Sequence, residues 1–166
     1  MSNPMQVTIR EFQMEDFPLV KEIYQLGIDT KNATFETTAP EWSEWDTKFL
    51  KEPRLVANND QQVMGWAALS QVSQRPVYKG VCEVSVYIHP DFFGKGYGRM
   101  LLSELITRSE QLGIWTLQAS IFPENTGSIK IHKELGFREV GYRERIGKMG
   151  NQWRNTILLE RRSKMV

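Results

Sequence analysis

Three glycines at alternate positions, Gly94, Gly96 and Gly98, separate a predicted strand from a predicted helix. The strand covers Val81–Ile88 and ends in a turn that Pro90 marks, and the helix carries a regular apolar stripe. A strand that leads through a glycine loop into a helix directs several backbone N–H groups, and the positive end of the helix dipole, at one place. The sequence therefore predicts an anion-binding loop here.

Length and composition predict one globular domain over residues 1–166. The 166 residues are 40% hydrophobic and 25% charged, without a shift in composition that would mark a linker. A formal net charge of +1 argues against a broad basic surface, and no apolar run approaches the length of a membrane span. Cys82 is the single cysteine, and it has no metal-ligand spacing to His89 or His132. We expect a cytoplasmic protein without a metal, nucleic acid or membrane partner.

Hydrophobic periodicity predicts the order of the elements. Strands are expected at Val7–Glu11, Arg54–Asn58, Val63–Ser73, Val81–Ile88, Ile114–Ile121, Arg138–Ile146 and Gln152–Glu160, and helices after a cap at Asp16, over Pro40–Lys51, from the glycines to Gly113, and over Asn125–Leu135. Asn59-Asp60 is expected to turn a hairpin, and Gly136 to form a left-handed helix cap. This order predicts an α/β protein with a mixed sheet and packed helices (an α+β arrangement) rather than a pure βαβ repeat.

Two other phosphate-binding motifs do not fit the glycine loop. A P-loop requires Ser or Thr after Gly-Lys, and here Gly94-Lys95 is followed by Gly96. A dinucleotide fingerprint requires an acidic residue about 20 positions further on, at a strand end, and this stretch has none in place. A purely conformational role of the glycines in a tight turn stays open at this point.

The loop and several segments around it resemble the GCN5-related N-acetyltransferase (GNAT) superfamily. The acyl-CoA pyrophosphate loop of that superfamily, Gln/Arg-x-x-Gly-x-Gly/Ala, falls on Phe93–Gly98, with Phe93 in the Gln/Arg position. The details are most similar to the phosphinothricin and methionine sulfoximine acetyltransferase subgroup. The segments that carry this resemblance are IRxxxxxD at Ile9–Asp16, NATFETT at Asn32–Thr38, GWAALS at Gly65–Ser70, RPVY at Arg75–Tyr78, EVSVYIHP at Glu83–Pro90, ENTGSIKIHKELGF at Glu124–Phe137 and GKMGNQW at Gly147–Trp153.

The resemblance implies the GNAT fold, with a mostly antiparallel sheet in which one parallel strand pair splays apart, and acetyl-CoA as co-substrate. It implies that backbone amides of the loop bind the pyrophosphate and that backbone groups of the preceding strand bind the pantetheine arm and the acetyl carbonyl. The implied cofactor-binding residues are Val86, Tyr87, Ile88, Gly94, Lys95, Gly96, Tyr97, Gly98, Arg99, Asn125 and Ser128. The ordinary alternatives are solvated charges for Lys95 and Arg99 and a plain helix N-cap for Asn125.

Glu83 and His132 are the candidate catalytic residues. If the strand alternates regularly, Cys82 faces the core while Glu83 faces the other way, where it could accept a proton from a substrate ammonium. His132 falls where many superfamily members have a tyrosine that protonates the leaving thiolate, and the subgroup has histidine there. A solvated glutamate and a structural histidine are the alternatives, and the sequence does not decide which residue is the base. Because Cys82 is expected to face inward, direct transfer in a ternary complex is favoured over an acyl-enzyme.

The resemblance implies N-acetylation of phosphinothricin, methionine sulfoximine or sulfone, or a related small amino acid. The candidate substrate-binding residues are Phe35, Glu36, Arg75, Tyr78 and Trp153. Each of them taken singly has an ordinary alternative as a core residue or a solvated surface residue. Together they suit a zwitterion, since a guanidinium binds a carboxylate or phosphinate, aromatic rings enclose a short side chain, and a glutamate meets an ammonium.

Other functions remain open at this stage. The same fold could acetylate general L-amino acids, a polyamine, an aminoglycoside or a protein amine, or act as a non-catalytic acyl-CoA sensor. The subgroup typically forms homodimers, and we expect exposed aromatic residues such as Trp42, Trp45 or Trp115 to line such an interface.

Overall fold

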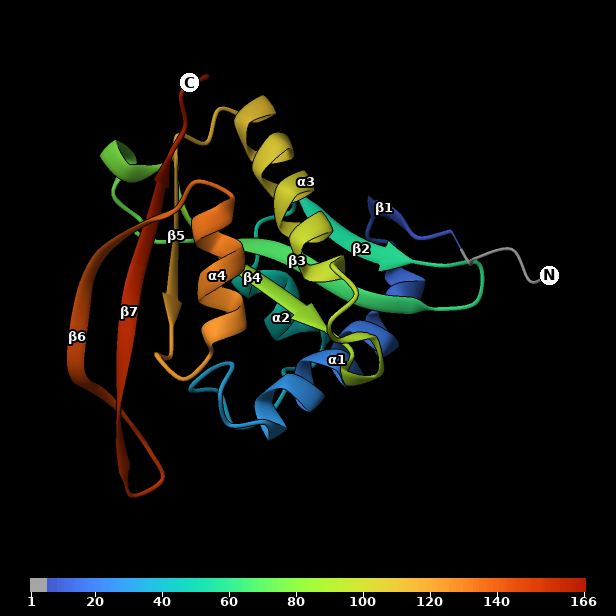
Figure 1. The fold of residues 1–166 in the computed structure, drawn as a ribbon. Helices are drawn as coiled ribbons and strands as arrows, with labels where there is room; N and C mark the ends of the chain where they lie inside the picture. The colour runs from blue at the N-terminus through green and yellow to red at the C-terminus, as the bar shows by residue number, and fades with distance from the viewer. Residues whose placement is uncertain (1–5) are drawn as a thin grey trace.

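The computed structural model describes residues 6–166, and its seven strands form one sheet in the order β1-β2-β3-β4-β5-β7-β6 (Figure 1). The strands are β1 (Thr8–Glu11), β2 (Arg54–Asn58), β3 (Val63–Gln71), β4 (Val81–Ile88), β5 (Thr116–Ile121), β6 (Arg138–Met149) and β7 (Gln152–Arg162). All neighbouring strands are antiparallel except β4 and β5, which are parallel. The predicted mixed sheet with one parallel pair is confirmed.

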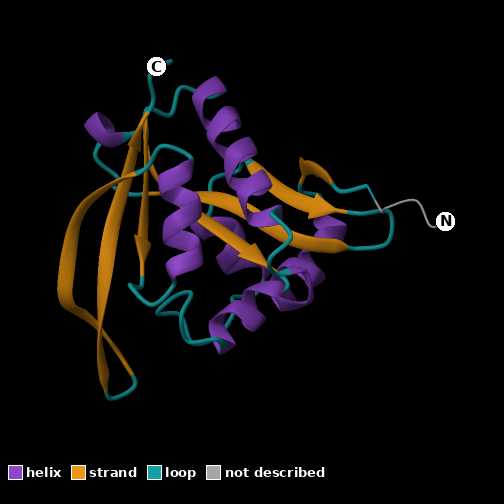
Figure 2. Cartoon of the chain, viewed as in Figure 1, coloured by secondary structure: helices purple, strands orange, loops and turns teal. Residues whose placement is uncertain are grey.

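Helices cover both faces of this sheet (Figure 2). They are α1 (Phe17–Asp29), α2 (Trp42–Lys48), α3 (Tyr97–Gln111) and α4 (Thr126–Glu134). Side chains of β2 alternate between the two sides: Leu55 and Ala57 belong to the core under α3, and Val56 belongs to the core under α1. Over residues 6–166, no helix has the length and apolar character needed to cross a membrane.

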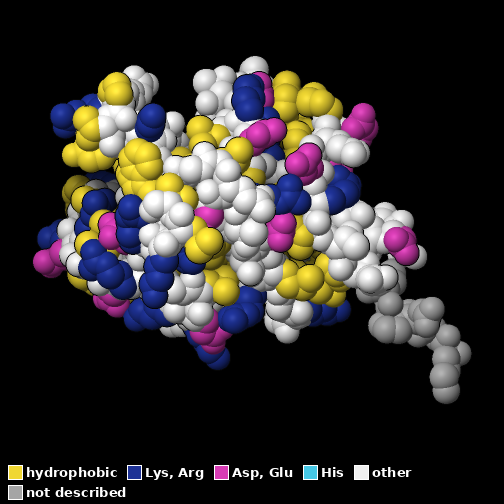
Figure 3. Space-filling view, turned by 90° about the horizontal axis from the view of Figure 1, so that it is seen from above, with side chains coloured by type: hydrophobic (Ala, Val, Ile, Leu, Met, Phe, Trp, Pro, Cys, Tyr) yellow, Lys and Arg dark blue, Asp and Glu magenta, His cyan; other side chains and the backbone are white. Residues whose placement is uncertain are grey.

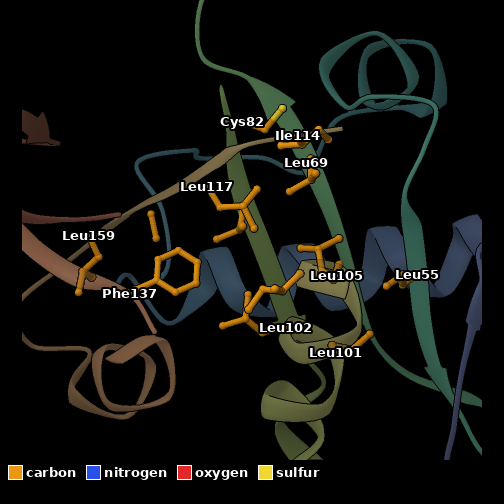
Figure 4. Close-up of a cluster of buried hydrophobic side chains, with 14 of the residues drawn as sticks. Leu55, Leu69, Cys82, Leu101, Leu102, Leu105, Ile114, Leu117, Phe137 and Leu159 are labelled. Atoms are coloured by element: carbon orange, nitrogen blue, oxygen red, sulfur yellow. The ribbon is translucent and has the colours of Figure 1, made fainter. Parts of the chain in front are cut away.

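The first core lies between α3 and the sheet (Figure 4). Leu101, Leu102 and Leu105 of α3 are completely buried there, because the i, i+1, i+4 spacing places them on one stripe of the helix. Phe137, which follows α4, and Leu159 of β7 belong to the same core. The glycine loop is therefore attached to a helix whose apolar stripe is anchored in the core, which fixes the start of that helix.

The second core, under α1 and α2, is largely aromatic. Trp66 of β3 stacks on Tyr87 of β4 at 5.1 Å between ring centroids, and Tyr24 of α1 lies 4.8 Å from Tyr87. Trp45 is 1% exposed and packs 5.5 Å from Trp66, so the prediction that Trp45 lines an exposed interface is wrong. The physical reason is that α2 lies flat over the sheet and its inward face carries this indole. Trp42 and Trp115 are only partly exposed.

Several element ends differ from the sequence prediction. The second helix is shorter than Pro40–Lys51, because the backbone at Phe49 is extended. The fifth strand begins at Thr116, since the amide of Ile114 still bonds to the end of α3. The last two strands continue beyond their predicted ends, to Met149 and Arg162, and form a long hairpin.

The prediction that Asp16 caps α1 is wrong for its side chain, which makes no capping hydrogen bond to the helix. Its carboxylate instead accepts hydrogen bonds from both terminal nitrogens of Arg10 at 2.8 Å and from the amide of Gln13 at 2.8 Å. These bonds lower the pKa of Asp16, although its burial acts in the opposite direction. The predicted left-handed cap at Gly136 is confirmed, with φ at 96°.

Candidate functional site

The parallel strands β4 and β5 separate after three residue pairs. Pairing runs from Val81 with Thr116 to Glu83 with Gln118, whereas both strands continue beyond this point. The edge of β4 that faces β5 is therefore unpaired after Glu83. Two cavities lie at this opening: one of about 540 Å³ beside the glycine loop, called the groove, and one of about 430 Å³ on the side of α1 and α2, called the pocket.

The groove runs from the glycine loop along the unpaired part of β4 to the start of α4. Of the predicted cofactor-binding residues, it is lined by Val86, Tyr87, Ile88, Gly94, Gly96, Tyr97, Gly98, Asn125 and Ser128. Lys95 and Arg99 are the two that do not line it. The separate sequence segments that suggested a binding site for acyl-CoA thus come together along one continuous surface.

The glycine loop presents unpaired backbone donors to the groove. Gly94 and Gly96 have φ angles of 77° and 83°, in the left-handed region that side chains disfavour. The first bond of α3 runs from the amide of Met100 to the carbonyl of Gly96, so the amides from Gly94 to Arg99 have no acceptor among the described residues. Free amides at the start of a 15-residue helix are groups that could hold an anion such as a pyrophosphate.

The charged residues near the loop have partners on the protein itself. The guanidinium of Arg99 forms an ion pair with Glu134 on α4, so its charge is already matched. The ammonium of Lys95 lies 5.7 Å from the centroid of the Phe92 ring. Phe93, at the position of the usual Gln or Arg, is 58% exposed and lines the groove. The groups of the loop that lack a partner among the described residues are therefore backbone amides rather than the guanidinium of Arg99.

Asn125 caps α4 and also holds a neighbouring loop. Its Oδ1 accepts a bond from the amide of Ser128 at 3.4 Å, which confirms the predicted N-cap. Its Nδ2 donates to the carbonyl of Asn32 at 3.3 Å. These two bonds fix the orientation of the side-chain amide, and they leave one N–H donor and one acceptor lone pair of Asn125 for a ligand in the groove.

His132 lies at the junction of the two cavities and is 6% exposed. Its Nδ1 is 2.7 Å from the carbonyl oxygen of Ser128, and because a carbonyl can only accept, Nδ1 carries the proton. Nε2 of the neutral ring is then an unprotonated acceptor. Burial lowers the pKa of His132 below its ordinary value, and the bond to Ser128 offsets only part of that effect.

Glu83 is a half-buried carboxylate that lines the pocket. Its Oε1 accepts a bond from Nε2 of Gln118 at 3.3 Å, across the last residue pair before β4 and β5 separate. The predicted alternation is confirmed here, since Cys82 and Val84 are buried in the first core while Ser85 lines the pocket with Glu83. The carboxylate of Glu83 therefore lies at the point where β4 and β5 begin to separate.

The early loop supplies the aromatic wall of the pocket. Phe35 packs edge-on against Phe122, with 4.9 Å between ring centroids, and Glu36 follows it at the rim. A side chain at Gly147 of β6 would lie 2.6 Å from the ring of Phe35, so the hairpin can approach only because this residue is glycine. Phe35 and Glu36 are therefore placed in the pocket as predicted.

The remaining predicted substrate residues do not line the pocket of their own chain. Arg75 lies in a smaller neighbouring cavity, with its guanidinium 5.5 Å from the ring centroid of Tyr78, which is 43% exposed. Trp153 is exposed on the β6–β7 hairpin, between the cationic groups of Arg145 and Lys148 at 5.7 and 5.4 Å. The structure brings together Phe35, Glu36, Glu83 and His132 but not these three.

Sequence reasoning missed three residues at the site. Gln118 pairs in register with Glu83, a signal that appears only once the parallel pairing is known. Lys48 lines the pocket from the end of a helix whose local pattern predicts only packing. Arg154 is 8% exposed and donates to the carbonyl of Lys31 and the side chain of Asn32 at 2.7 and 2.9 Å. A buried arginine cannot be told from an exposed one by sequence spacing.

Charge is unevenly distributed over the surface. In the view from above, lysine and arginine side chains gather on the side where β6 and β7 lie in Figure 1, and acidic side chains are scattered (Figure 3). The exposed basic residues of the β6–β7 hairpin are Arg138, Arg143, Arg145, Lys148 and Arg162, and its acidic residues are Glu139, Glu144 and Glu160. A basic hairpin beside the site is unfavourable for polycationic acceptors and favourable for anionic groups.

Comparisons with known proteins agree with this geometry. A model of the Acetyltransferase (GNAT) family matches residues 8–137. The chain is 34% identical over 161 residues to the phosphinothricin N-acetyltransferase of Alcaligenes faecalis, with 93% of this chain and 81% of that protein covered. It is 28% identical over 162 residues to an L-methionine sulfoximine/L-methionine sulfone acetyltransferase of Pseudomonas aeruginosa, with 94% of each covered. The structure of a phosphinothricin acetyltransferase from Sinorhizobium meliloti in complex with AcCoA is similar at a TM-score of 0.85 and 31% identity, over 95% of this chain and 89% of that one.

Proposed function

Because the chain belongs to the Acetyltransferase (GNAT) family, we propose that it transfers the acetyl group of acetyl-CoA to the α-amino group of a small amino acid of the phosphinothricin or methionine sulfoximine type. One observation carries this proposal. The groove and the pocket meet where β4 and β5 separate, and His132 lines both of them. A donor in the groove and an acceptor in the pocket would therefore meet at this point.

The groove is proposed to hold acetyl-CoA through the backbone. Free amides from Gly94 to Arg99 suit the pyrophosphate, because N–H groups at a helix start are preorganised donors. Unpaired backbone groups of Val86 and Ile88 suit the pantetheine arm and the thioester oxygen, in the place where β5 would otherwise pair. The backbone groups of Tyr87 point toward β3, as does the amide of His89, so Tyr87 would contact the arm through its side chain. A backbone donor aimed at that oxygen would stabilise the negative charge that develops on it during acyl transfer. Asn125 and Ser128 are proposed to contact the same arm from α4.

Glu83 and His132 are proposed to share the proton transfers. Glu83 accepts a proton from the substrate ammonium, directly or through a water, and so frees the nitrogen lone pair for attack on the thioester carbon. As the C–N bond forms and the C–S bond breaks, the nitrogen loses a second proton. Nε2 of the neutral His132 can accept this proton and return it to the departing thiolate, which leaves as the thiol of CoA.

Transfer is proposed to be direct, in a ternary complex. Cys82 is fully buried in the first core, and this burial raises the pKa of its thiol to about 11. A buried, protonated thiol is a poor nucleophile, and its side chain belongs to the core rather than to the groove or the pocket. The acetyl group therefore would not pass through an acyl-enzyme.

We also propose a homodimer that works in the cytoplasm as one catalytic domain per chain. The β6–β7 hairpin exposes Tyr142, Ile146 and Trp153, which are 54%, 52% and 48% exposed, at the edge of the sheet. A second copy packed on this hairpin would cover these side chains.

Three predicted substrate residues lie outside the pocket of their own chain: Arg75, Tyr78 and Trp153. They are proposed to reach the acceptor across such an interface. Analytical ultracentrifugation of the wild-type protein and of Trp153→Ser tests the dimer, and cell fractionation tests the location.

The experiment that tests the activity is release of CoA from acetyl-CoA in the presence of a panel of amines. The panel contains phosphinothricin, methionine sulfoximine, methionine sulfone, free L-amino acids, spermidine, an aminoglycoside and a lysine peptide. Turnover with the small amino acids is the expected result. Turnover with the polycations or the peptide alone would overturn the substrate class, and acetyl-CoA binding without turnover of any amine would identify a sensor.

A further inference from the structure

Lys48, the last residue of α2, extends its ammonium to the rim of the pocket. Its Nζ lies 3.0 Å from the hydroxyl oxygen of Tyr24 and 3.3 Å from Oε1 of Glu36. The ring centroids of Tyr24 and Phe49 are 5.7 and 5.3 Å away. A lysine held by two polar partners and flanked by two rings has lost most of the freedom of a surface lysine, so its charge has a defined position.

The position of the Lys48 ammonium matters because the pocket has few charged groups. Among the described residues that line the pocket, Lys48 is the one lysine or arginine, and Glu36 and Glu83 are the two carboxylates. Glu36 is paired with Lys48, and Glu83 is bonded only to the neutral side chain of Gln118. Within one chain, a zwitterionic amino acid with its ammonium at Glu83 therefore finds one cation in the pocket for its carboxylate.

Lys48 is also in the state needed to bind an anion. Burial lowers the pKa of Lys48, but the hydrogen bond to Tyr24 and the negative charge of Glu36 outweigh this effect, and the pKa lies above its ordinary value. The side chain therefore stays an ammonium at neutral pH. An ammonium has three N–H donors, and the bonds to Tyr24 and Glu36 account for two of them among the described residues. One donor remains for a ligand.

Arg75 is the other cation close to this region, and its location separates it from Lys48. The two side chains share a smaller cavity, but only Lys48 also lines the pocket that contains Glu83. The guanidinium of Arg75 faces the exposed ring of Tyr78 instead. Within one chain, Lys48 is therefore the cation that an acceptor beside Glu83 can reach.

We propose that Lys48 binds the α-carboxylate of the acceptor amino acid, with Tyr24 and Glu36 holding its ammonium in place. This inference rests on the proposed function, since it assigns one end of the proposed acceptor. Lys48 is thus a specificity-determining residue for amino acids over simple amines. A charge-assisted bond between an ammonium and a carboxylate in a partly desolvated pocket is stronger than a neutral bond, and it would be lost with an acceptor that has no carboxylate.

The test compares L-methionine sulfone with its carboxamide as acceptors, for the wild-type enzyme and for Lys48→Met. The wild-type enzyme is expected to prefer the acid, and Lys48→Met to lose roughly 10- to 100-fold in kcat/KM for the acid while changing little for the carboxamide. Because each amine has the same intrinsic reactivity with both enzymes, the change in the acid-to-amide ratio isolates recognition of the carboxylate. Lys48→Arg keeps the charge and should retain most of the preference.

Lys51→Met is the matched control, because Lys51 lies three residues further along, does not line the pocket, and pairs with Asp46. Its acid-to-amide ratio should equal that of the wild-type enzyme. Unchanged affinity of Lys48→Met for acetyl-CoA shows that the variant is folded, since Lys48 does not line the groove. An unchanged acid preference in Lys48→Met overturns the role of Lys48 and leaves the proposed function intact. A wild-type enzyme that acetylates neither compound nor any other amino acid overturns both.

Discussion

The guanidinium carbon of Arg154 lies 4.0 Å from the centroid of the Phe122 ring, and this contact joins the hairpin to the floor of the pocket. The same guanidinium donates to the carbonyl of Lys31, whose φ of 61° is unusual for a residue other than glycine, and to Oδ1 of Asn32. It also forms an ion pair with Glu124 at 3.3 Å. One buried side chain thus holds together the early loop, the end of β5 and the last strand.

Replacing Arg154 with Met should therefore loosen the loop that carries Phe35. We expect the free energy of unfolding to fall by about 1–3 kcal/mol, because three acceptors lose a charged donor, and the KM for the acceptor to rise more than the KM for acetyl-CoA. Urea unfolding and steady-state kinetics measure the two effects. Arg138→Met is the control, since Arg138 is an exposed partner of Glu160 and should change stability by less than about 0.5 kcal/mol.

Replacing Glu83 with Gln keeps the shape of the side chain and removes its basicity. We expect kcat to fall by about 100- to 10,000-fold, the usual contribution of a positioned general base, with little change in acetyl-CoA affinity. Single-turnover kinetics and calorimetric titration with acetyl-CoA separate the two quantities. The exposed Glu15→Gln variant should behave like the wild type. Wild-type turnover in Glu83→Gln would remove this residue from the mechanism.

His132 predicts a dependence of stability on pH. Its pKa in the folded protein lies below the value of 6.5 that applies to the unfolded chain. Between these two values the unfolded chain binds a proton that the folded chain does not, so the free energy of unfolding decreases as the pH falls from 7 through 6.5 towards the folded-state pKa.

Urea unfolding at pH 7 and pH 5 of the wild type, His132→Asn and His89→Asn tests this dependence. The loss of stability on acidification should be smaller in His132→Asn than in the wild type, and His89→Asn, the other histidine variant the chain allows, should retain the wild-type loss. If Nε2 of His132 is the acceptor in catalysis, His132→Asn also loses the acid limb of the kcat profile. Equal losses of stability in all three proteins contradict the burial effect.

Substitution of Gly96 tests the proposed anion site, and the same substitution of Gly113 is its control. Both have positive φ angles, 83° and 79°, and a methyl group added to either meets nothing within 4 Å, so alanine should cost about 1 kcal/mol of stability at each from backbone strain alone. Only Gly96 orients the free amides of the groove, and Gly96→Ala should weaken acetyl-CoA binding by about tenfold. Gly113→Ala should bind acetyl-CoA as the wild type does. Equal affinities in both variants would mean that the loop backbone does not hold the donor.

Cys82→Ala tests the direct route of transfer. We expect kcat to change by less than about twofold, because a buried thiol with a raised pKa takes no part in the chemistry. Mass spectrometry of the wild-type enzyme quenched during turnover should detect no acetylated cysteine. Loss of turnover in a folded Cys82→Ala protein, together with an acetylated thiol in the wild type, would establish an acyl-enzyme instead.

The sequence predicts the order of the elements and the anion loop because both depend on local signals. The alternation around Glu83 and the left-handed cap at Gly136 are properties of short segments, and the structure has them as predicted. The ends of the hairpin and the burial of Trp45 depend on which elements meet in space, and no local pattern reports that. The residues of the pocket illustrate the same difference. Phe35 and Glu36 are neighbours in the chain and are predicted together, whereas the contact of Lys48 with Tyr24 joins two helices and has no local signal.

The two cavities at the opening between β4 and β5 depend on the amino-acid sequence in different ways. Acetyl-CoA, as we propose it binds, depends mainly on backbone groups of β4 and the glycine loop, and these tolerate many side-chain changes elsewhere. The acceptor, as we propose it binds, depends on side chains such as Lys48 and Phe35, which come from α2 and the early loop. New acceptor preferences can therefore arise by substitution on the α1–α2 side while the thioester chemistry is inherited unchanged.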